Sequence, residues 1–161
     1  MLEKSLKQLL KGSETLISVK IAEYDDLIFE VQKEILSAKE EILIRVWSDE
    51  FVKIEEQLRK AEEKGINIQL LSFTPLSKPI GRTFSYNIDP SSFKENWKRG
   101  LALAVDNKKV LVGNKIGRNP IQGLITNDQL ITESIRDQIL LDLELAKGRL
   151  YRKEDASDLE L

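Results

Sequence analysis

The residues best suited to chemistry surround two short apolar runs in the second half of the chain. Asp106 separates the run at 101–105 from a second run that ends at Gly113-Asn114, and Arg99 precedes the first run. The guanidinium fork of arginine suits a carboxylate or phosphate, so Arg99 is a candidate anion-binding residue. Asp106 is either a turn residue that bonds its own backbone or a ligand contact. Asn114 leaves the same two alternatives open.

A second candidate set follows an apolar stretch over residues 42–47. Open α/β sheets bind ligands at the carboxyl ends of their strands, which is where Trp47 is expected. Trp47 is therefore either a core residue or a platform on which a sugar or ring stacks. Arg45, Ser48 and Glu50 surround it in sequence and complete the candidate ligand-binding residues.

The composition excludes several chemistries. The chain has 161 residues with no cysteine and no histidine, which removes disulfides, thiolate metal sites, imidazole bases and histidine metal ligands. The pairs Glu40-Glu41 and Glu55-Glu56 are adjacent in sequence, so on a helix they point in different directions and are expected to be solvated. We expect no metal and no cofactor.

Charge and hydropathy limit the partners and the cellular location that we expect for the protein. The net charge is −2, which argues against this chain alone gripping nucleic acid. No apolar run reaches the roughly 18 residues of a membrane helix, and the N-terminus lacks the apolar core of a signal peptide. The sequence therefore predicts a globular protein of the cytoplasm without a membrane partner.

Hydrophobic periodicity predicts the elements of the first half. In order they are a helix over 2–10, an edge strand over 16–20, a helix over 24–39, a strand over 42–47, a helix ending at Lys64-Gly65 and a strand over 66–71. Ser48 or Asp49 is expected to cap the helix that follows Trp47. Strand, helix, glycine and strand form a right-handed βαβ unit, which implies a mainly parallel inner sheet.

The second half begins with a stretch that lacks a regular pattern. Residues 72–98 contain three prolines and scattered aromatics, and they are expected to form either a surface excursion or a lid over a pocket. A hairpin over 100–105 and 109–112, a strand over 121–126 and a final helix closed by Gly148 follow. Thr126 or Asn127 is the expected cap of that helix. Lys115 and Arg118 beside Gly117 are a weaker candidate for an anion-binding loop.

These elements predict an α/β fold with a mixed, mostly parallel sheet and helices on both faces. Residues 1–13 are expected to be a helical linker or dimerisation stub, residues 14–148 the folded domain, and residues 149–161 a disordered acidic tail.

The hairpin around Asp106 resembles the core hairpin of the phospholipase D-like fold, which in active members reads H-x-K-x4-D followed by G-S. When Asp106 takes the aspartate position, Arg99 falls on the histidine, Leu101 on the lysine and Gly113-Asn114 on the Gly-Ser. The resemblance implies a phospholipase D-like half-domain that keeps the scaffold and lacks the hydrolase.

The order of motifs is similar to that of the C-terminal domain of TrmB-like transcriptional regulators. The segments that carry the similarity are Ala38-Lys-Glu-Glu-Ile through Trp47, Lys64-Gly65-Ile66, Val105-Asp106 and Leu124-Ile125-Thr126, within residues 16–147. The resemblance implies an effector-sensing domain that follows a winged-helix DNA-binding domain and a helical linker; several members sense sugars. Here no winged-helix domain is expected before Leu2, and no room is expected after Lys147 for an additional β-domain.

The leading hypothesis is therefore a non-enzymatic effector-sensing and dimerisation domain of a transcriptional regulator. Active phospholipase D-like folds pair two halves, so one half predicts a homodimer. The effector would be a sugar or an anionic metabolite, and DNA would be bound only through an upstream winged-helix domain. The alternatives are a pure protein–protein interaction module and a carboxylate-based hydrolase. The hydrolase is the poorer hypothesis, because Asp106 has no activating base.

Overall fold

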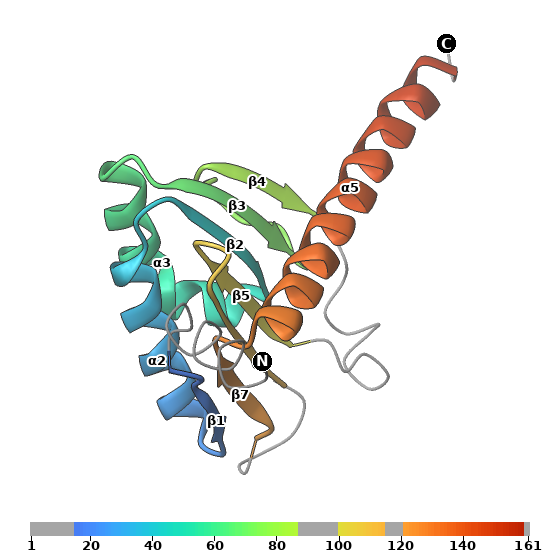
Figure 1. The fold of residues 1–161 in the computed structure, drawn as a ribbon. Coiled ribbons are helices and arrows are strands. Elements are labelled where there is room, and N and C mark those ends of the chain that lie inside the picture. The colour runs from blue at the N-terminus through green and yellow to red at the C-terminus, as the bar shows by residue number, and fades with distance from the viewer. Residues whose placement is uncertain (1–14, 87–99, 115–120, 160–161) are drawn as a thin grey trace.

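The computed structural model describes residues 15–86, 100–114 and 121–159, with side chains described up to residue 148. Within these residues the chain forms one seven-stranded sheet and three long helices (Figure 1). The strands are β1 (Ser18–Ile21), β2 (Glu41–Val46), β3 (Asn67–Ser72), β4 (Arg82–Ser85), β5 (Leu101–Val105), β6 (Lys109–Gly113) and β7 (Gly123–Thr126). The helices are α2 (Tyr24–Ser37), α3 (Ser48–Glu63) and α5 (Gln129–Leu159).

The sheet is mixed, but the expectation that it is mostly parallel is wrong. Its order is β1-β7-β6-β5-β2-β3-β4. Only the β2–β3 and β3–β4 pairings are parallel, whereas the other four pairings are antiparallel. The βαβ unit β2-α3-β3 is confirmed. Among the antiparallel pairs, a short turn joins β5 and β6, whereas β1–β7 and β2–β5 bring together strands that are far apart in the sequence.

The expected long irregular segment contains a strand. β4 lies within residues 72–98 and pairs in parallel with β3 at the edge of the sheet. Its sequence, Arg-Thr-Phe-Ser, is short and follows Pro79, so it lacks the apolar alternation that marks a strand in a sequence. The remaining part of the segment, residues 87–99, lies outside the described residues, as do residues 1–14 and 115–120.

Helices cover both faces of the sheet, as expected (Figure 1). On one face α2 and α3 pack together over the larger core, which includes Val31, Ile44 and Leu58. On the other face α5 crosses the sheet over a smaller core of Leu43, Ala104 and its own residues Ile139 and Leu143. Alternation along β2 assigns its side chains to the two cores in turn, so Arg45 faces α5 with Leu43.

The α2 and α3 helices form where the apolar periodicity predicts them, with differences at their margins. Leu36 and Val52 lie at positions that fit the apolar periodicity of α2 and α3, but they are 42% and 72% exposed. Phe51 takes the inward position instead of Val52. The end of α3 at Lys64-Gly65 is confirmed, because Gly65 adopts a φ of +83° that a side chain would disfavour.

The final helix begins and ends differently from the expectation. Asp128, rather than Thr126 or Asn127, caps α5 by accepting the Ile131 N–H at 3.0 Å. Leu130 and Ile131 fit the apolar periodicity of α5, but they are 75% and 36% exposed, because they lie in the first turn before α5 crosses the sheet. The backbone of α5 runs past Gly148 to Leu159, since one glycine costs a helix only about 1 kcal/mol.

The division of the chain at residues 13 and 149 stays a prediction. Among the described residues, no helix is long and apolar enough to cross a membrane.

Two glycines give opposite predictions for stability. A Cβ on Gly100 would lie 1.8 Å from the Gly113 carbonyl oxygen, whereas a Cβ on Gly148 would meet nothing within 4 Å. We expect Gly100→Ala to destabilise the fold by about 1–3 kcal/mol, since backbone must move. We expect Gly148→Ala to stabilise it by about 0.5–1 kcal/mol, because alanine suits a helix interior. Urea unfolding measures both values. A destabilising Gly148→Ala would contradict a continuous α5.

Candidate functional site

Most of the predicted site residues gather at one end of the sheet. Arg45, Trp47, Ser48 and Glu50 lie where β2 ends and α3 begins. Asn114 follows β6 and belongs to the same end, because Arg45 is opposite Ala102 and Leu101 is opposite Gly113. We call this end of the sheet the carboxyl edge. Arg99 lies outside the described residues, and so do Lys115 and Arg118.

Arg45 is held in a buried ion pair. Its Nη1 lies 2.7 Å from Oδ2 of Asp142 on α5, and the two side chains are only 6% and 3% exposed. The Arg45 guanidinium also lies 6.0 Å from the centre of the Phe73 ring. Two charges removed from water cost several kcal/mol each, so the pair persists only because its geometry compensates. Arg45 therefore joins the carboxyl edge to α5.

Trp47 is packed among aromatic rings. Its ring centre lies 4.7 Å from that of Phe73, which in turn stacks against Tyr86 at 6.2 Å. Trp47 is 4% exposed, which favours the core alternative over an open stacking platform. The hydroxyl of Tyr86 donates to the Asp142 backbone carbonyl at 2.8 Å. The aromatic cluster thus rests on the same segment of α5 as Arg45.

Ser48 and Glu50 lie in the first turn of α3. The Glu50 carboxylate accepts the Trp47 backbone N–H at 3.1 Å, so Glu50 rather than Ser48 or Asp49 satisfies the start of the helix. The Ser48 N–H donates to the Thr74 hydroxyl at 3.1 Å. Glu50 is 1% exposed and lies near Tyr24 at the start of α2. Burial, followed by the charges of Glu50, Asp49 and Asp25, raises the pKa of Tyr24 to about 12.

Asp106 does not lie with the other candidates. It follows β5 at the opposite end of the sheet, where its Oδ1 accepts the Glu40 and Glu41 N–H groups at 2.8 and 2.9 Å. Its Oδ2 accepts the Lys39 N–H at 3.0 Å. Asp106 and Asn107 adopt φ of 55° and 53°, as a tight hairpin turn requires. Asp106 thus occupies the turn, but its carboxylate bonds the backbone of residues 39–41 rather than its own, which neither expected alternative included.

The pKa of Asp106 reflects those contacts. Burial opposes its ionisation, but the three backbone N–H groups and the charge of Lys108 outweigh burial and lower the pKa below the usual value.

Four residues of the carboxyl edge were not predicted from the sequence. Phe73 and Thr74 directly follow β3, the neighbour of β2, so the carboxyl-end rule would have included them. Asp142 lies among the apolar residues of α5, and an acid at an inward position was a usable signal. Tyr86 follows β4, which was itself missed.

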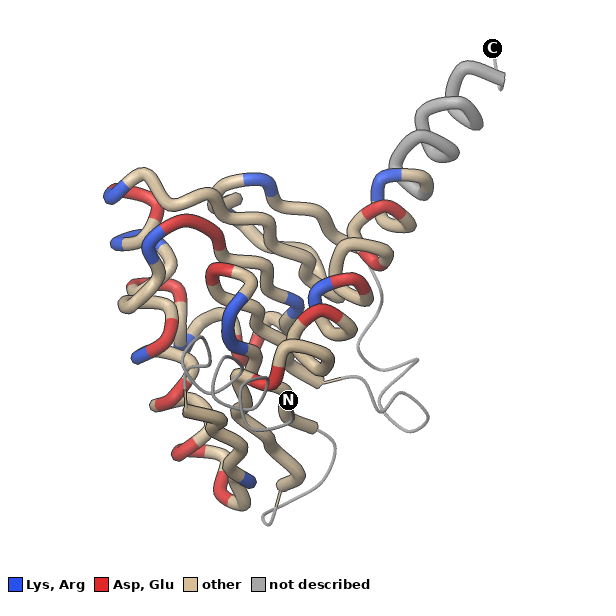
Figure 2. Tube along the Cα trace, in the orientation of Figure 1, with Lys and Arg blue, Asp and Glu red and all other residues tan. Residues whose placement is uncertain are grey.

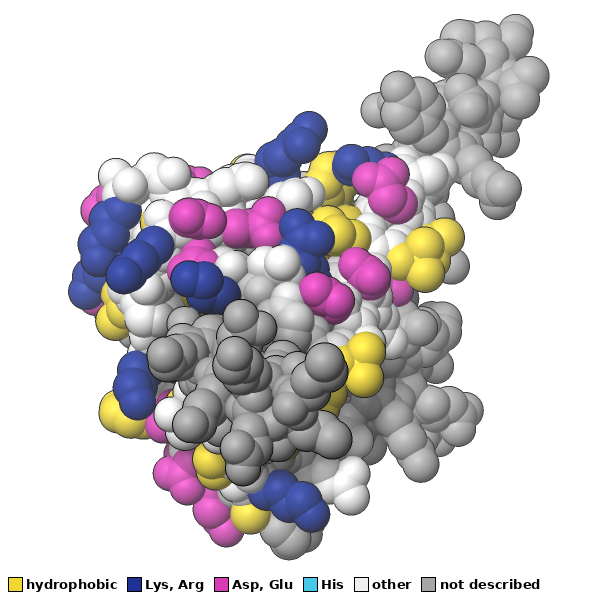
Figure 3. Space-filling model, in the orientation of Figure 1, with side chains coloured by type: hydrophobic (Ala, Val, Ile, Leu, Met, Phe, Trp, Pro, Cys, Tyr) yellow, Lys and Arg dark blue, Asp and Glu magenta, His cyan; other side chains and the backbone are white. Residues whose placement is uncertain are grey.

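The described part of the carboxyl edge carries side chains that suit ligand binding. It combines aromatic rings, one arginine and hydroxyl groups, whereas the described residues contain no group of three or more acids that could hold a metal. Along the described backbone, Lys and Arg positions are interspersed with Asp and Glu positions (Figure 2). Exposed hydrophobic side chains form small separate groups on the face in Figure 3. No broad basic surface is evident on the described residues in these views.

A comparison with known families decides the assignment. Residues 18–135 match the family described as transcriptional regulator TrmB, EBD N-terminal subdomain. The chain belongs to this TrmB family. The resemblance of its motifs to TrmB-like regulators is thereby confirmed. A relative by sequence is YrhO, an uncharacterized protein of Bacillus subtilis (strain 168), which is 25% identical over 88 residues. That match covers 55% of this chain and 32% of YrhO.

Solved structures confirm the phospholipase D-like fold of this TrmB-family chain. NucT from Helicobacter pylori superimposes with a TM-score of 0.59 at 16% identity, over 80% of this chain and 96% of NucT. TrmBL2, an archaeal chromatin protein, gives 0.61 at 14% identity, over 90% of this chain and 62% of TrmBL2. Nuc from Salmonella typhimurium, a phospholipase D family member, gives 0.52 at 15% identity, over 78% and 92%.

The contacts of Asp106 predict a pH-dependent stability. Asp106→Asn keeps a residue that tolerates positive φ but replaces one acceptor oxygen by an NH₂ group, so we expect a loss of about 1–3 kcal/mol at neutral pH. The folded-state pKa is lowered, so the contribution of the charge is complete above the unfolded value of about 3.9 and is lost as pH falls towards the folded value. Urea unfolding from pH 7 to pH 3 should show the two proteins converging. A difference independent of pH would contradict this assignment.

The ion pair between Arg45 and Asp142 predicts strong coupling. Asp142→Leu leaves Arg45 buried beside an apolar group, and we expect it to destabilise the fold by about 3–5 kcal/mol. The double variant Arg45→Met/Asp142→Leu removes both charges and should be less destabilised than the sum of the single variants. A double-mutant cycle in urea measures the coupling. Additive effects would show that the pair contributes no interaction energy.

Proposed function

We propose that this chain is the non-catalytic effector-sensing and dimerisation domain of a TrmB-like transcriptional regulator. The membership in the TrmB family supports a regulator-related role. TrmBL2 is described as showing a novel mode of DNA binding, which is a property of that protein. For this chain we propose that DNA is bound only through an upstream winged-helix domain. A regulator of transcription also fits a cytoplasmic protein.

The observation that carries the proposal is the ion pair that joins the carboxyl edge to α5. An effector acts by binding one arrangement of a protein more tightly than another. Arg45 lies at the end of β2, where ligands bind in open α/β sheets. Its partner Asp142 lies 97 residues away on α5, the helix that covers the face of the sheet towards which Arg45 points. A ligand that contacts Arg45 would therefore compete with Asp142 for its guanidinium and change the position of α5 on the sheet.

The effector class follows from the side chains available. Aromatic rings and hydroxyl groups favour a sugar, while arginine favours an anionic metabolite. Arg45, Trp47, Ser48, Glu50 and Asn114 remain the proposed ligand-binding residues, although Arg45, Trp47 and Glu50 act from buried positions. Arg99 is proposed only from its place in the sequence, because it lies outside the described residues. Asp106 is withdrawn from this set by its position.

The proposal of a non-catalytic domain is supported by the hairpin. In active phospholipase D-like proteins the motif supplies a histidine nucleophile and a phosphate-binding lysine. Arg99 and Leu101 stand at these positions here, and Leu101 is a buried core residue. A carboxylate hydrolase finds less support, because Asp106 is saturated by backbone N–H groups at the other end of the sheet.

A thermal-shift screen of the chain against sugars, sugar phosphates and organic acids tests effector sensing. A ligand that binds only the folded state raises its stability by about 2.7 kcal/mol at a hundredfold excess over its Kd. Asn114→Ala removes a half-buried amide at the carboxyl edge and should reduce the shift. Asn67→Ala, a matched change of an exposed asparagine at the start of β3, should leave the shift intact.

Two outcomes would count against the proposal. A screen without any shift would favour the pure protein–protein interaction module. Sedimentation of a monomer at all concentrations would exclude a role in dimerisation, whatever the screen shows.

A further inference from the structure

A groove lies at the end of the sheet opposite the carboxyl edge. It has a volume of about 330 Å³, and it runs between the end of α2, the turn of the β5–β6 hairpin and the first described residues before β1. Its walls include Thr15, Ile17, Glu34, Asp106, Lys109 and Asn127. Ligand pockets have volumes of about 300–1,000 Å³, so this groove suits a small metabolite.

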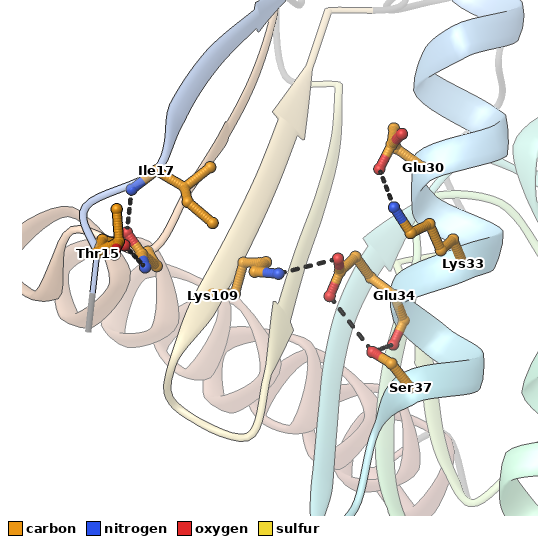
Figure 4. A network of polar contacts seen from close by, with 8 residues as sticks. Thr15, Ile17, Glu30, Lys33, Glu34, Ser37 and Lys109 are labelled. Atoms are coloured by element: carbon orange, nitrogen blue, oxygen red, sulfur yellow. Dashed lines mark hydrogen bonds and ion pairs between the residues drawn. The ribbon is translucent and has the colours of Figure 1, made fainter.

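An ion pair lies in the wall of the groove (Figure 4). The Nζ of Lys109 lies 3.1 Å from Oε1 of Glu34, and the Ser37 hydroxyl lies 3.4 Å from the other carboxylate oxygen. The side chain of Glu34 is 8% exposed and that of Lys109 is 29% exposed. A largely buried ion pair is a weak source of stability. Its position in a groove therefore favours a role in binding.

The groove offers a place for a cation. A carboxylate has about four lone-pair positions, so Glu34 can accept a further donor beside Lys109 and Ser37. The groove also adjoins the end of α2, where the helix dipole is negative and the last turn contains no basic residue. An ammonium group fits between these two features.

The groove also offers a place for an anion. Lys109 has three N–H donors and uses one on Glu34. Lys108, which is exposed on the hairpin turn, lines the same groove. Asp106 also lines the groove and is ionised, but the three N–H dipoles of residues 39–41 offset part of its charge, so Lys108 and Lys109 provide the cationic side of the groove.

We propose that this groove is a second ligand site, which binds a small zwitterion of the size of an amino acid or dipeptide. The ligand's ammonium group lies beside Glu34 and the end of α2, and its carboxylate lies beside Lys108 and Lys109. Ile17 and Val105 provide apolar surface for its side chain. The site is separate from the proposed effector site, and it does not depend on that proposal.

Nuclear magnetic resonance titration of the whole chain with L-leucine, L-glutamine and L-alanyl-L-alanine tests the site. We expect saturable shifts of the Thr15, Ile17 and Asn127 amides, with those of Ser48 and Asn114 unchanged. N-acetyl-L-leucine and L-leucinamide each lack one of the two charges, so each should bind about tenfold or more weaker than L-leucine. The absence of saturable groove shifts with all three zwitterions would overturn the proposal.

Variants separate the ion pair of the groove from general charge effects. Glu34→Gln should weaken the best-binding zwitterion about tenfold or more. Lys108→Glu tests the anion end at an exposed position and should also weaken binding without affecting the fold. The matched control is Glu30→Gln/Lys33→Met. It removes an ion pair, 3.8 Å apart, that lies on α2 like Glu34 but does not line the groove (Figure 4). Equal effects of control and groove variants would overturn the proposal.

Discussion

The carboxylate of Asp106 fixes the arrangement of the central strands. It accepts three successive backbone N–H groups from residues 39–41, and the Asp106 N–H donates to the Glu41 carbonyl at 2.9 Å. These bonds tie the hairpin turn to the first residue of β2 and so set Ile42 opposite Val105. A slip of one residue would exchange the two faces of β2 and place Arg45 in the larger apolar core. The position of every residue at the carboxyl edge follows from this register.

Charge within the smaller core is the second constraint. Arg45 lies on the same face as Leu43, so the register that buries Leu43 beneath α5 buries Arg45 as well. A buried charge is unfavourable without a partner. Asp142 of α5 pairs with the Arg45 guanidinium, and the ring of Phe73 lies beside it. Two apolar side chains at these positions would be buried without the cost of removing charges from water. The ion pair therefore contributes less to stability than to fixing the position of α5 on the sheet.

The sequence was most informative where periodicity and turn chemistry agreed. The βαβ unit, the β5–β6 hairpin and the end of α3 at Gly65 were predicted because an apolar pattern meets a residue with a special backbone preference. The parallel character of the sheet was overestimated because strand direction depends on connections, and hydropathy does not show whether a turn or a crossover joins two strands. β4 was missed because it obtains its stability from pairing with β3 rather than from its own four residues.

The candidate site was predictable only in part for a related reason. A rule about strand ends places Trp47, Ser48 and Glu50 together, since they are adjacent in the chain. It cannot supply Asp142, which arrives from 97 residues away. Sequence spacing also suggested that Asp106 and Asn114 belong to one site, although they flank opposite ends of one strand, β6. At about 3.4 Å per residue, the five residues of β6 separate the two ends by roughly 17 Å.

The same geometry gives the domain two chemically different ends. One end holds aromatic rings and an arginine whose partner is on α5. The other end holds an ammonium–carboxylate pair in the groove that Thr15, just before β1, also lines. β5 and β6 span both ends and are bonded to each other along their whole length. A change at either end must therefore either move the hairpin as a unit or stay local. Packed strands deform little, so coupling between the ends would require two discrete arrangements of the hairpin rather than gradual bending.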